Sequence, residues 1–261
     1  MIKSLNTAAT GMIAQQSNID VVANNIANVN TAGFKKGRAE FEDLIYHNLK
    51  DPGQASGLQS VSPTGVQTGL GVRTAAVQKD FSMGQVLITK NPLDLHIEGP
   101  GFFQVQTTDG EIAYTRDGAF KKDANGRLAD KNGNLLVPNI TVPPNASGIE
   151  INPSGQVSAL IGQDSEPQAV GQIDIANFIN PAGLKNVGKN LYVTTVASGP
   201  ATNLTPGTDG VGYLAQGELE SSNVNIVDEM INMIAAQRAY ETNSKVVQTA
   251  DQMLQTANNI R

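Results

Sequence analysis

The fold is decided by the stretch Leu5-Asn-Thr-Ala-Ala-Thr-Gly-Met-Ile-Ala-Gln-Gln-Ser-Asn-Ile-Asp-Val-Val-Ala-Asn-Asn-Ile-Ala-Asn-Val29. Mostly apolar residues recur in it at alternating steps of three and four, namely Leu5, Ala8, Met12, Gln15, Ile19, Val22, Ile26 and Val29. This spacing keeps one face of a helix against a partner, as in a coiled-coil seam. We therefore predict a helix from about Ser4 to about Val29. It should stop near Gly33, because glycine readily takes the left-handed conformation that ends helices.

The outer faces of this helix are almost uncharged. From Met1 to Ala32 the only charged residues are Lys3 and Asp20, whereas an ordinary surface helix carries charges where it meets water. We interpret the segment as a helix surrounded by other protein in an assembly of many copies. The simpler alternative is an amphipathic helix that covers the core of its own domain.

The end of the chain repeats the pattern about 200 residues later. One seam position recurs every seventh residue, at Ile226, Met233, Tyr240, Val247 and Leu254, and the second holds Met230, Gln237 and Ser244. This helix should begin after Ser222 or Asn223 as N-cap and run to near Asn259. Its charged residues Arg238, Glu241, Lys245 and Asp251 indicate that part of its surface faces water.

Composition excludes several classes of protein. The chain has 261 residues, a net charge of −6 and no Lys/Arg cluster longer than a pair, so nucleic acid is not expected as a partner. The absence of cysteine excludes disulfides and thiol chemistry. The start lacks the continuous apolar core of a secretory signal, and no window is apolar enough to insert directly into a membrane. Any export should therefore use a route without a cleaved peptide.

Between the helices the period changes from helical to two-fold. The dipeptides Asp109-Gly110, Asp117-Gly118, Asn125-Gly126 and Asn132-Gly133 separate short apolar runs and suit the positive φ angles of hairpin turns. Further strands are expected at 86–89, 93–97, 149–151, 157–161, 169–175 and 191–196. The predicted fold class is α+β, with paired terminal helices and an inserted antiparallel all-β domain.

The expected domains follow from these elements. They are a coiled-coil helix at 1–33, an extended arm and linker at 34–90 with an insertion at 47–71, a central β domain at 91–199, a return linker at 200–221, and a second coiled-coil helix at 222–261 that packs with 1–33. The segment 34–50 should contain an extended piece and a helical turn. The Gly-, Pro- and Ser-rich segment 51–71 is expected to be a long loop or arm that touches neighbouring subunits.

No residue pattern indicates catalysis, a cofactor or a metal. The two histidines, His47 and His96, have no ligand-spaced neighbours and are interpreted as structural or surface residues. Asp123 and Asp130 begin segments similar to calcium loops, but these lack the acidic spacing and the closing glutamate, so they are interpreted as turns. The sequence therefore predicts a protein that is not an enzyme.

Four segments carry a family resemblance. Ala23-Asn-Asn-Ile-Ala-Asn-Val-Asn-Thr-Ala-Gly-Phe-Lys35 resembles the N-terminal signature of bacterial flagellar rod and hook proteins. Ser222-Asn-Val-Asn-Ile-Val-Asp-Glu-Met230, followed by Gln237-Arg-Ala-Tyr-Glu-Thr-Asn-Ser-Lys245, resembles their C-terminal signature. Gly99-Pro-Gly-Phe-Phe-Gln-Val105 and Ala113-Tyr-Thr-Arg-Asp-Gly-Ala-Phe120 resemble the family's central β region. The positions matched to the terminal signatures are Asn24, Asn25, Ala27, Asn28, Thr31, Gly33, Phe34, Asn223, Asn225, Gln237, Arg238 and Tyr240.

The resemblance implies a structural role. The chain length and the insertion after Tyr46 are most similar to a distal-rod subunit, which polymerises into a hollow, rigid drive shaft across the periplasm. Implied partners are other copies of the chain, proximal rod and hook or hook-junction proteins, the surrounding P- and L-ring proteins and the flagellar type III export apparatus. The seam positions expected from their spacing to mediate self-assembly are Leu5, Met12, Ile19, Val22, Ile26, Val29, Ile226, Met230, Met233, Tyr240, Val247 and Leu254. Alternatives are a proximal rod or hook subunit, or a secreted β-rich oligomeric binding module.

Overall fold

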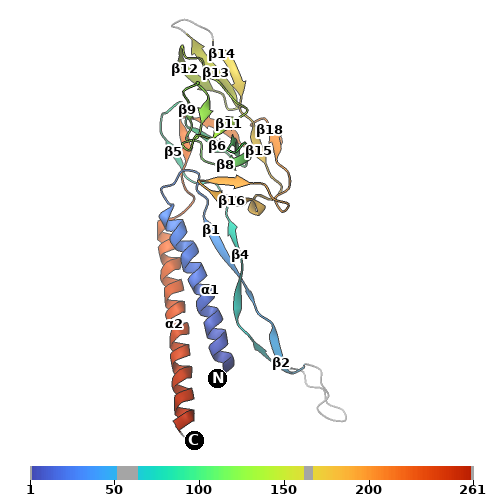
Figure 1. Ribbon diagram of the computed structural model, residues 1–261, viewed down its shortest axis with the longest axis vertical. Coiled ribbons are helices and arrows are strands. Elements are labelled where there is room, and N and C mark those ends of the chain that lie inside the picture. Colours follow the sequence, from blue (N-terminus) through green and yellow to red (C-terminus); the bar gives the residue numbers. More distant parts are fainter. Residues whose placement is uncertain (1, 52–63, 162–166, 260–261) are drawn as a thin grey trace. The chain divides into compact units, whose positions relative to one another are not determined.

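The computed structural model describes residues 2–51, 64–161 and 167–259, which form two compact units (Figure 1). Unit 1 combines the described residues of 1–27, 37–79 and 225–261. Unit 2 combines 28–36 with the described residues of 80–224. The α+β class is confirmed, with one long helix near each end of the chain and strands between them. No helix in the described ranges has the length and apolar character that a bilayer span requires.

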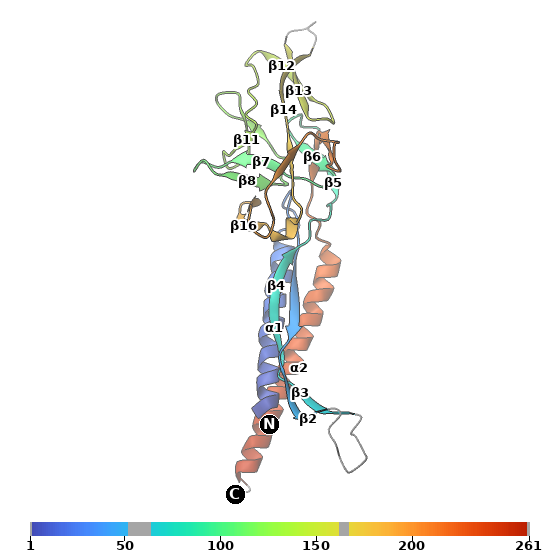
Figure 2. The ribbon, with the colours of Figure 1, turned by 90° about the vertical axis from the view of Figure 1, so that its right-hand side faces the viewer.

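Unit 1 is built from two helices and a narrow ribbon. Helix α1 (Ile2–Ala27) ends two residues before the predicted limit and packs along α2 (Ile226–Asn259). Strand β1 (Gly37–Asp43) pairs antiparallel with β4 (Val72–Lys79), and both strands contact α1 (Figure 2). Beyond them, β2 (Tyr46–Lys50) pairs with β3 (Val66–Gly69).

The ribbon changes two expectations. The helical turn expected within 34–50 is absent, because β1 and β2 fill this segment with extended backbone. The arm expected at 51–71 is partly strand, since β3 returns along β2. Residues 52–63, at the centre of the expected insertion, lie outside the described residues.

Unit 2 is a set of antiparallel sheets. The seven-stranded sheet runs in the order β16 (Lys185–Gly188), β17 (Leu191–Val193), β8 (Ile112–Thr115), β7 (Phe103–Gln106), β11 (Leu135–Val137), β10 (Leu128–Ala129) and β9 (Lys121–Lys122). A three-stranded sheet contains β12 (Ala146–Ile151), β13 (Gln156–Ile161) and β14 (Gln168–Gln172). Two-stranded pairs are β15 (Ile175–Asn177) with β18 (Thr202–Leu204), β6 (Leu95–Glu98) with β19 (Tyr213–Gln216), and β5 (Val86–Ile88) with β20 (Glu218–Glu220). A short 3-10 helix, η1, spans Pro181–Gly183.

These pairings revise the expected boundaries. The segment 200–221, expected as a return linker, carries β18, β19 and β20, each of which pairs with a strand far back in the sequence. The segment 80–90, expected in the arm and linker, contributes β5 to the same unit. Residues 28–36 also belong to unit 2, although they follow α1 directly.

Glycine placement explains the meander. Gly110, Gly126 and Gly133 have φ angles of 85°, 78° and 84°, which confirms three of the four predicted turns. Gly118 is different, because its φ is not in the left-handed region and a Cβ there would lie 1.7 Å from the Leu95 carbonyl oxygen. Gly118 is thus required for a close backbone approach.

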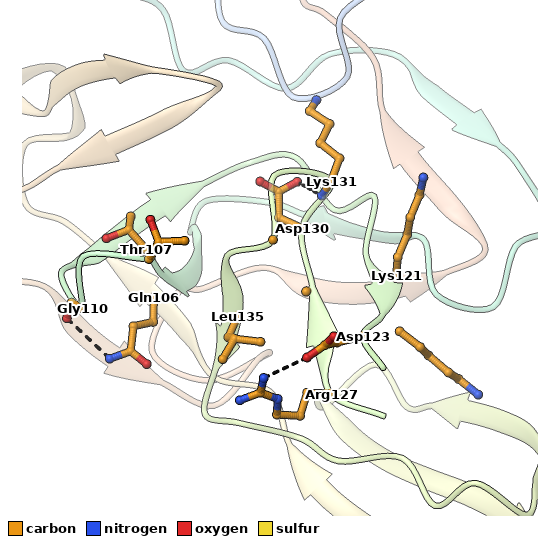
Figure 3. Close-up of a pocket in the computed structure, with 13 residues that line it drawn as sticks. Gln106, Thr107, Gly110, Lys121, Asp123, Arg127, Asp130, Lys131 and Leu135 are labelled. Carbon is orange, nitrogen blue, oxygen red and sulfur yellow. Dashed lines mark hydrogen bonds and ion pairs between the residues drawn. The ribbon is translucent and has the colours of Figure 1, made fainter. Parts of the chain in front are cut away.

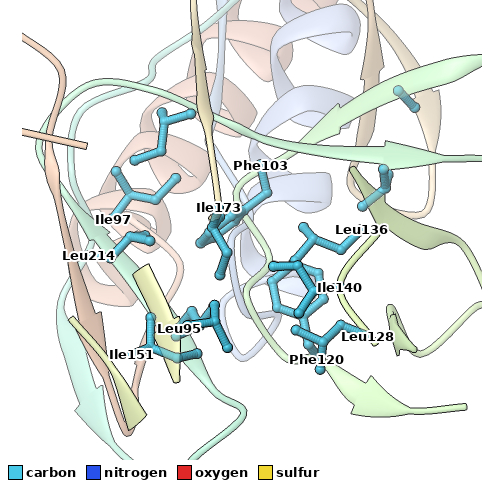
Figure 4. Packing of buried hydrophobic residues seen from close by; sticks show 14 of the residues in the cluster. Leu95, Ile97, Phe103, Phe120, Leu128, Leu136, Ile140, Ile151, Ile173 and Leu214 are labelled. Carbon is cyan, nitrogen blue, oxygen red and sulfur yellow. The ribbon is translucent and has the colours of Figure 1, made fainter. Parts of the chain in front are cut away.

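The core of unit 2 lies among these sheets (Figure 4). Phe103 and Phe120 meet edge to face, with ring centroids 5.2 Å apart, an arrangement that aromatic quadrupoles favour. Apolar residues from β6, β7, β13 and the segment around Ile173 are almost fully buried around them. A second cluster joins Phe102, Tyr114, Phe178 and Tyr192. Unit 2 therefore has its own hydrophobic core.

Candidate assembly interface

The two helices of unit 1 run antiparallel in a defined register. Gly11 of α1 lies against Asn243 of α2, and Asn25 of α1 binds Glu229 of α2. The two contacts are 14 residues apart on each helix, which is two heptads. They follow opposite chain directions on the two helices, so the helices are antiparallel. The same register places Asn18 opposite Ala236.

Asn25 connects three elements within unit 1. Its side-chain amide donates to the Gly37 carbonyl oxygen (2.8 Å) and to Glu229 Oε2 (3.2 Å), while its Oδ1 accepts from the Gly37 N–H (2.8 Å). Both Asn25 and Glu229 are buried. The amide thus pairs with the backbone at the start of β1 as another strand would, and it also binds α2. These bonds hold α1 in one position against β1 and α2.

Gly11 allows the helices to approach closely. A Cβ at this position would lie 2.9 Å from Asn243 Nδ2, which is shorter than real Cβ contacts. Glycine inside a helix normally costs about 1 kcal/mol relative to alanine. The cost is tolerated at Gly11 because any larger residue would collide with Asn243.

The predicted assembly residues fall into two groups. On α1, Val22 is buried, and Leu5, Met12, Ile19 and Ile26 are partly buried, as is Val29 just beyond the helix. On α2, Met233, Val247 and Leu254 are partly buried, whereas Ile226, Met230 and Tyr240 are exposed. The second line of α2 positions facing α1 is not the predicted Met230, Gln237 and Ser244. It consists of Glu229, Ala236, Asn243 and Ala250, of which all but the partly buried Asn243 are buried.

This line was missed because its residues are small or polar. Gly11, Asn18 and Asn25 recur every seven residues on α1, as do Glu229, Ala236, Asn243 and Ala250 on α2. Seven-residue spacing of Gly, Ala and Asn indicates both lines. Spacing of large apolar residues alone does not reveal them.

Helix α2 also carries a row of exposed apolar side chains, here called the outer stripe. It comprises Val227, Met230, Ile231 and Ile234, which are 63%, 52%, 60% and 49% exposed. Steps of three and four place these residues along one side of the helix. Contiguous exposed apolar surface of this kind is typical of a protein–protein contact.

Comparisons with known proteins identify the family. Family models match residues 5–35 (flagella basal body rod protein), 96–159 (flagellar hook protein FlgE/F/G D1 domain) and 215–260 (flagellar basal body rod FlgEFG protein C-terminal). The flagellar basal-body rod protein FlgG of Caulobacter vibrioides is 47% identical over the whole of both chains. FlgG of Borreliella burgdorferi is 48% identical, covering all of this chain and 99% of that protein.

The chain belongs to the FlgG family of flagellar basal-body rod proteins. FlgG of Bacillus subtilis is 38% identical over the full length of both proteins, whereas the hook protein FlgE of Escherichia coli is only 24% identical. As a FlgG-family member, the chain is a structural subunit of the distal rod in the flagellar basal body and is not an enzyme. Self-polymerisation and a contact on the hook side belong to this role.

FlgG-family motif positions serve both units. Asn225 caps α2, because its Oδ1 accepts from the Val227 N–H (3.0 Å), so the expectation of Ser222 or Asn223 as N-cap is wrong. Gly33 has φ +68°, as predicted, and Phe34 is buried in unit 2. Asn223 accepts from the Lys36 N–H and donates to the Asp80 carbonyl oxygen. The remaining matched residues are placed as follows: Asn24, Ala27, Gln237, Arg238 and Tyr240 are exposed, and Asn28 and Thr31 are partly buried.

A shallow hollow of about 620 Å³ lies on unit 2 (Figure 3). Its wall includes Lys121, Lys131 and Asp130, and Arg127 Nη2 binds Asp123 Oδ2 at 2.8 Å. Asp123 and Asp130 lie in turns, as predicted. The lining residues include no histidine and no nucleophile–base pair, and the described residues contain no cluster of metal-ligating side chains.

Proposed function

We propose that the chain polymerises through its terminal helices into a hollow, rigid shaft that transmits torque across the periplasm. The outer stripe of α2 is the observation that carries this proposal. Four half-exposed apolar side chains on one helix face remain costly in a monomer, and burying each against a neighbour stabilises the polymer by about 1 kcal/mol. The contact between α1 and α2 then acts as a short antiparallel coiled coil within each copy.

The assembly residues take two roles in this proposal. The partly buried set on α1, with Met233, Val247 and Leu254, holds the two helices of one copy together. The exposed set, Ile226, Met230 and Tyr240 with the outer stripe, contacts neighbouring copies. The exposed charges Arg238, Glu241, Lys245 and Asp251 suit the water-filled bore, because charged side chains there stay hydrated.

Further partners follow from the same role. We expect proximal rod and hook or hook-junction proteins at the two ends of the polymer, and P- and L-ring proteins around it. Delivery by the flagellar export apparatus is part of this proposal. The β2–β3 ribbon suits a contact with a neighbouring copy, because Tyr46 and Leu49 on β2 and Ile45 just before it are exposed.

The test replaces one residue of the outer stripe. Ile231→Asp should leave the monomer folded, because the side chain is exposed, but should abolish incorporation into rods and motility. The matched control is Ile179→Asp on unit 2, an equally apolar residue that is 92% exposed. Rods assembled normally from the Ile231→Asp protein would overturn the proposal.

A further inference from the structure

Unit 2 contains a fully buried group of charges. The side chains of Lys35, Glu220 and Arg116 are 0%, 1% and 3% exposed. Lys35 Nζ lies 2.5 Å from Glu220 Oε1, and Arg116 Nη1 lies 3.7 Å from Glu220 Oε2. Buried charges are retained only where partners compensate the lost hydration, so the group is a built feature of the fold.

Backbone groups add to the compensation. Lys35 also donates to the Ser82 carbonyl oxygen (2.7 Å), and the Gly84 N–H donates to Glu220 Oε1 (2.9 Å). Arg116 donates to the carbonyl oxygens of Ile97 and Gly99, at 3.2 and 2.6 Å. Burial acts to raise the pKa of the Glu220 carboxyl, but Arg116 and Lys35 outweigh it and hold this pKa below its ordinary value.

The group sits where the chain enters and leaves unit 2. The chain passes between the two units four times, after residues 27, 36, 79 and 224. Within unit 2 the segments next to these crossings are bonded to one another. The Gly33 N–H donates to the Glu220 carbonyl oxygen (2.8 Å), the Asp80 N–H donates to the Lys36 carbonyl oxygen (2.9 Å), and Asn223 binds both Lys36 and Asp80.

We propose that Lys35, Glu220 and Arg116, with the bonds of Gly33 and Asn223, form a mechanical clamp that carries load across the entry and exit of unit 2. Lys35 and Glu220 are 185 residues apart in sequence. Tension that enters along α1 and leaves along α2 therefore passes directly through the clamp. The chain between Lys35 and Glu220 does not carry this tension. The inference rests on the proposed shaft function, since only a load-bearing subunit needs such shielding.

Single-molecule stretching of the full chain between its two ends tests the clamp. At constant force the antiparallel helices α1 and α2 should separate first, because they lead directly to the two handles. Rupture of the clamp should follow as a distinct step that exposes up to roughly 60 nm of additional chain. Glu220→Gln or Lys35→Met should shorten the lifetime before this step at least tenfold.

Two further variants keep the result interpretable. Arg127→Gln removes an ion pair on the surface of the same unit and should leave the lifetime within twofold of the unmodified chain. Asn223→Ala keeps all three buried charges and should shorten the lifetime before clamp rupture about threefold. It tests the clamp even if the charge variants do not fold.

Unchanged lifetimes in folded Glu220→Gln and in Asn223→Ala would overturn the clamp. The stretching experiment uses monomers, so its failure would leave the polymerisation test with Ile231→Asp unaffected. If Ile231→Asp still builds normal rods but the clamp variants shorten the lifetime, the shaft proposal is contradicted and the clamp within the monomer still stands.

Discussion

At the residue scale, Asn25 joins α1, β1 and α2 of unit 1 through its side-chain amide. Asn25→Ala would leave the buried Gly37 N–H and carbonyl without their partners, and it would remove the donor to Glu229. Such losses cost about 1–3 kcal/mol each when the groups stay buried, so we expect unfolding of unit 1 to become easier by about 3 kcal/mol. Urea titration followed by circular dichroism measures this.

Asn6→Ala is the matched control, because Asn6 is an asparagine on the same helix and is exposed. Its effect should stay within about 0.5 kcal/mol. Equal losses from the two variants would show that the Asn25 contacts contribute nothing beyond helix propensity.

His96 makes unit 2 sensitive to acid. Burial lowers the pKa of the His96 imidazole, although Glu220 opposes this, and neither ring nitrogen has a hydrogen-bond partner among the described residues. The unfolded chain therefore takes up the proton at a higher pH than the folded chain does. Stability should fall as the pH drops below the ordinary histidine value of about 6.5 toward the lowered pKa.

Thermal unfolding between pH 7.5 and 5 checks this prediction. His96→Leu should flatten the dependence across that window, because it replaces a buried titrating ring with an apolar side chain. His47→Leu, which changes the other histidine at an exposed site, should leave the slope unchanged. A slope that survives His96→Leu would assign the acid sensitivity elsewhere.

At the element scale, Gly11 and Asn243 act as a pair. Gly11→Ala would gain about 1 kcal/mol of helix propensity, but its Cβ would collide with the Asn243 amide. We expect the single variant to be no more stable than the unmodified chain. Combined with Asn243→Ala it should recover the gain, giving a coupling of about 1 kcal/mol in a double-mutant cycle. Additive effects would show that the helices do not meet at these residues.

The elements themselves could largely be predicted from the sequence, but their contacts could not. Apolar spacing located both helices, and Asn-Gly and Asp-Gly dipeptides located three hairpin turns, because both signals are local. The seam line through Gly11, Asn18 and Asn25 was not predicted, although Asn25 itself was a motif residue, because close helix approach selects small and polar residues instead of apolar ones. Gly118 escaped for a similar reason, since its requirement comes from a distant carbonyl.

The buried charges were beyond the reach of sequence patterns. Lys35 lies in a recognised motif, yet nothing near it in sequence indicates that Glu220 is its partner 185 residues later. The strands of 200–221 were missed in the same way, since each is only three or four residues long and depends on a distant partner strand. Long-range pairing leaves little local signal.

At the scale of the whole molecule, the two units differ in how much apolar surface they bury. Unit 2 has its own hydrophobic core and buried charge group, whereas unit 1 exposes an apolar helix face and a long ribbon. We therefore expect unit 2 to be complete before assembly, and the exposed apolar face of unit 1 to be buried by neighbouring copies. The stability of the subunit in isolation and its ability to polymerise should therefore respond to different substitutions.

Hydrogen exchange on monomer and polymer tests that division most directly. Amides of residues 226–240 in α2 should be at least a hundredfold more protected in the polymer than in the monomer, because neighbouring copies cover the outer stripe. Amides of β6, β7 and β13 should be equally protected in both forms, because their core does not change. If the amides of 226–240 are already as protected in the monomer as in the polymer, the terminal helices are not the assembly surface and the account is contradicted.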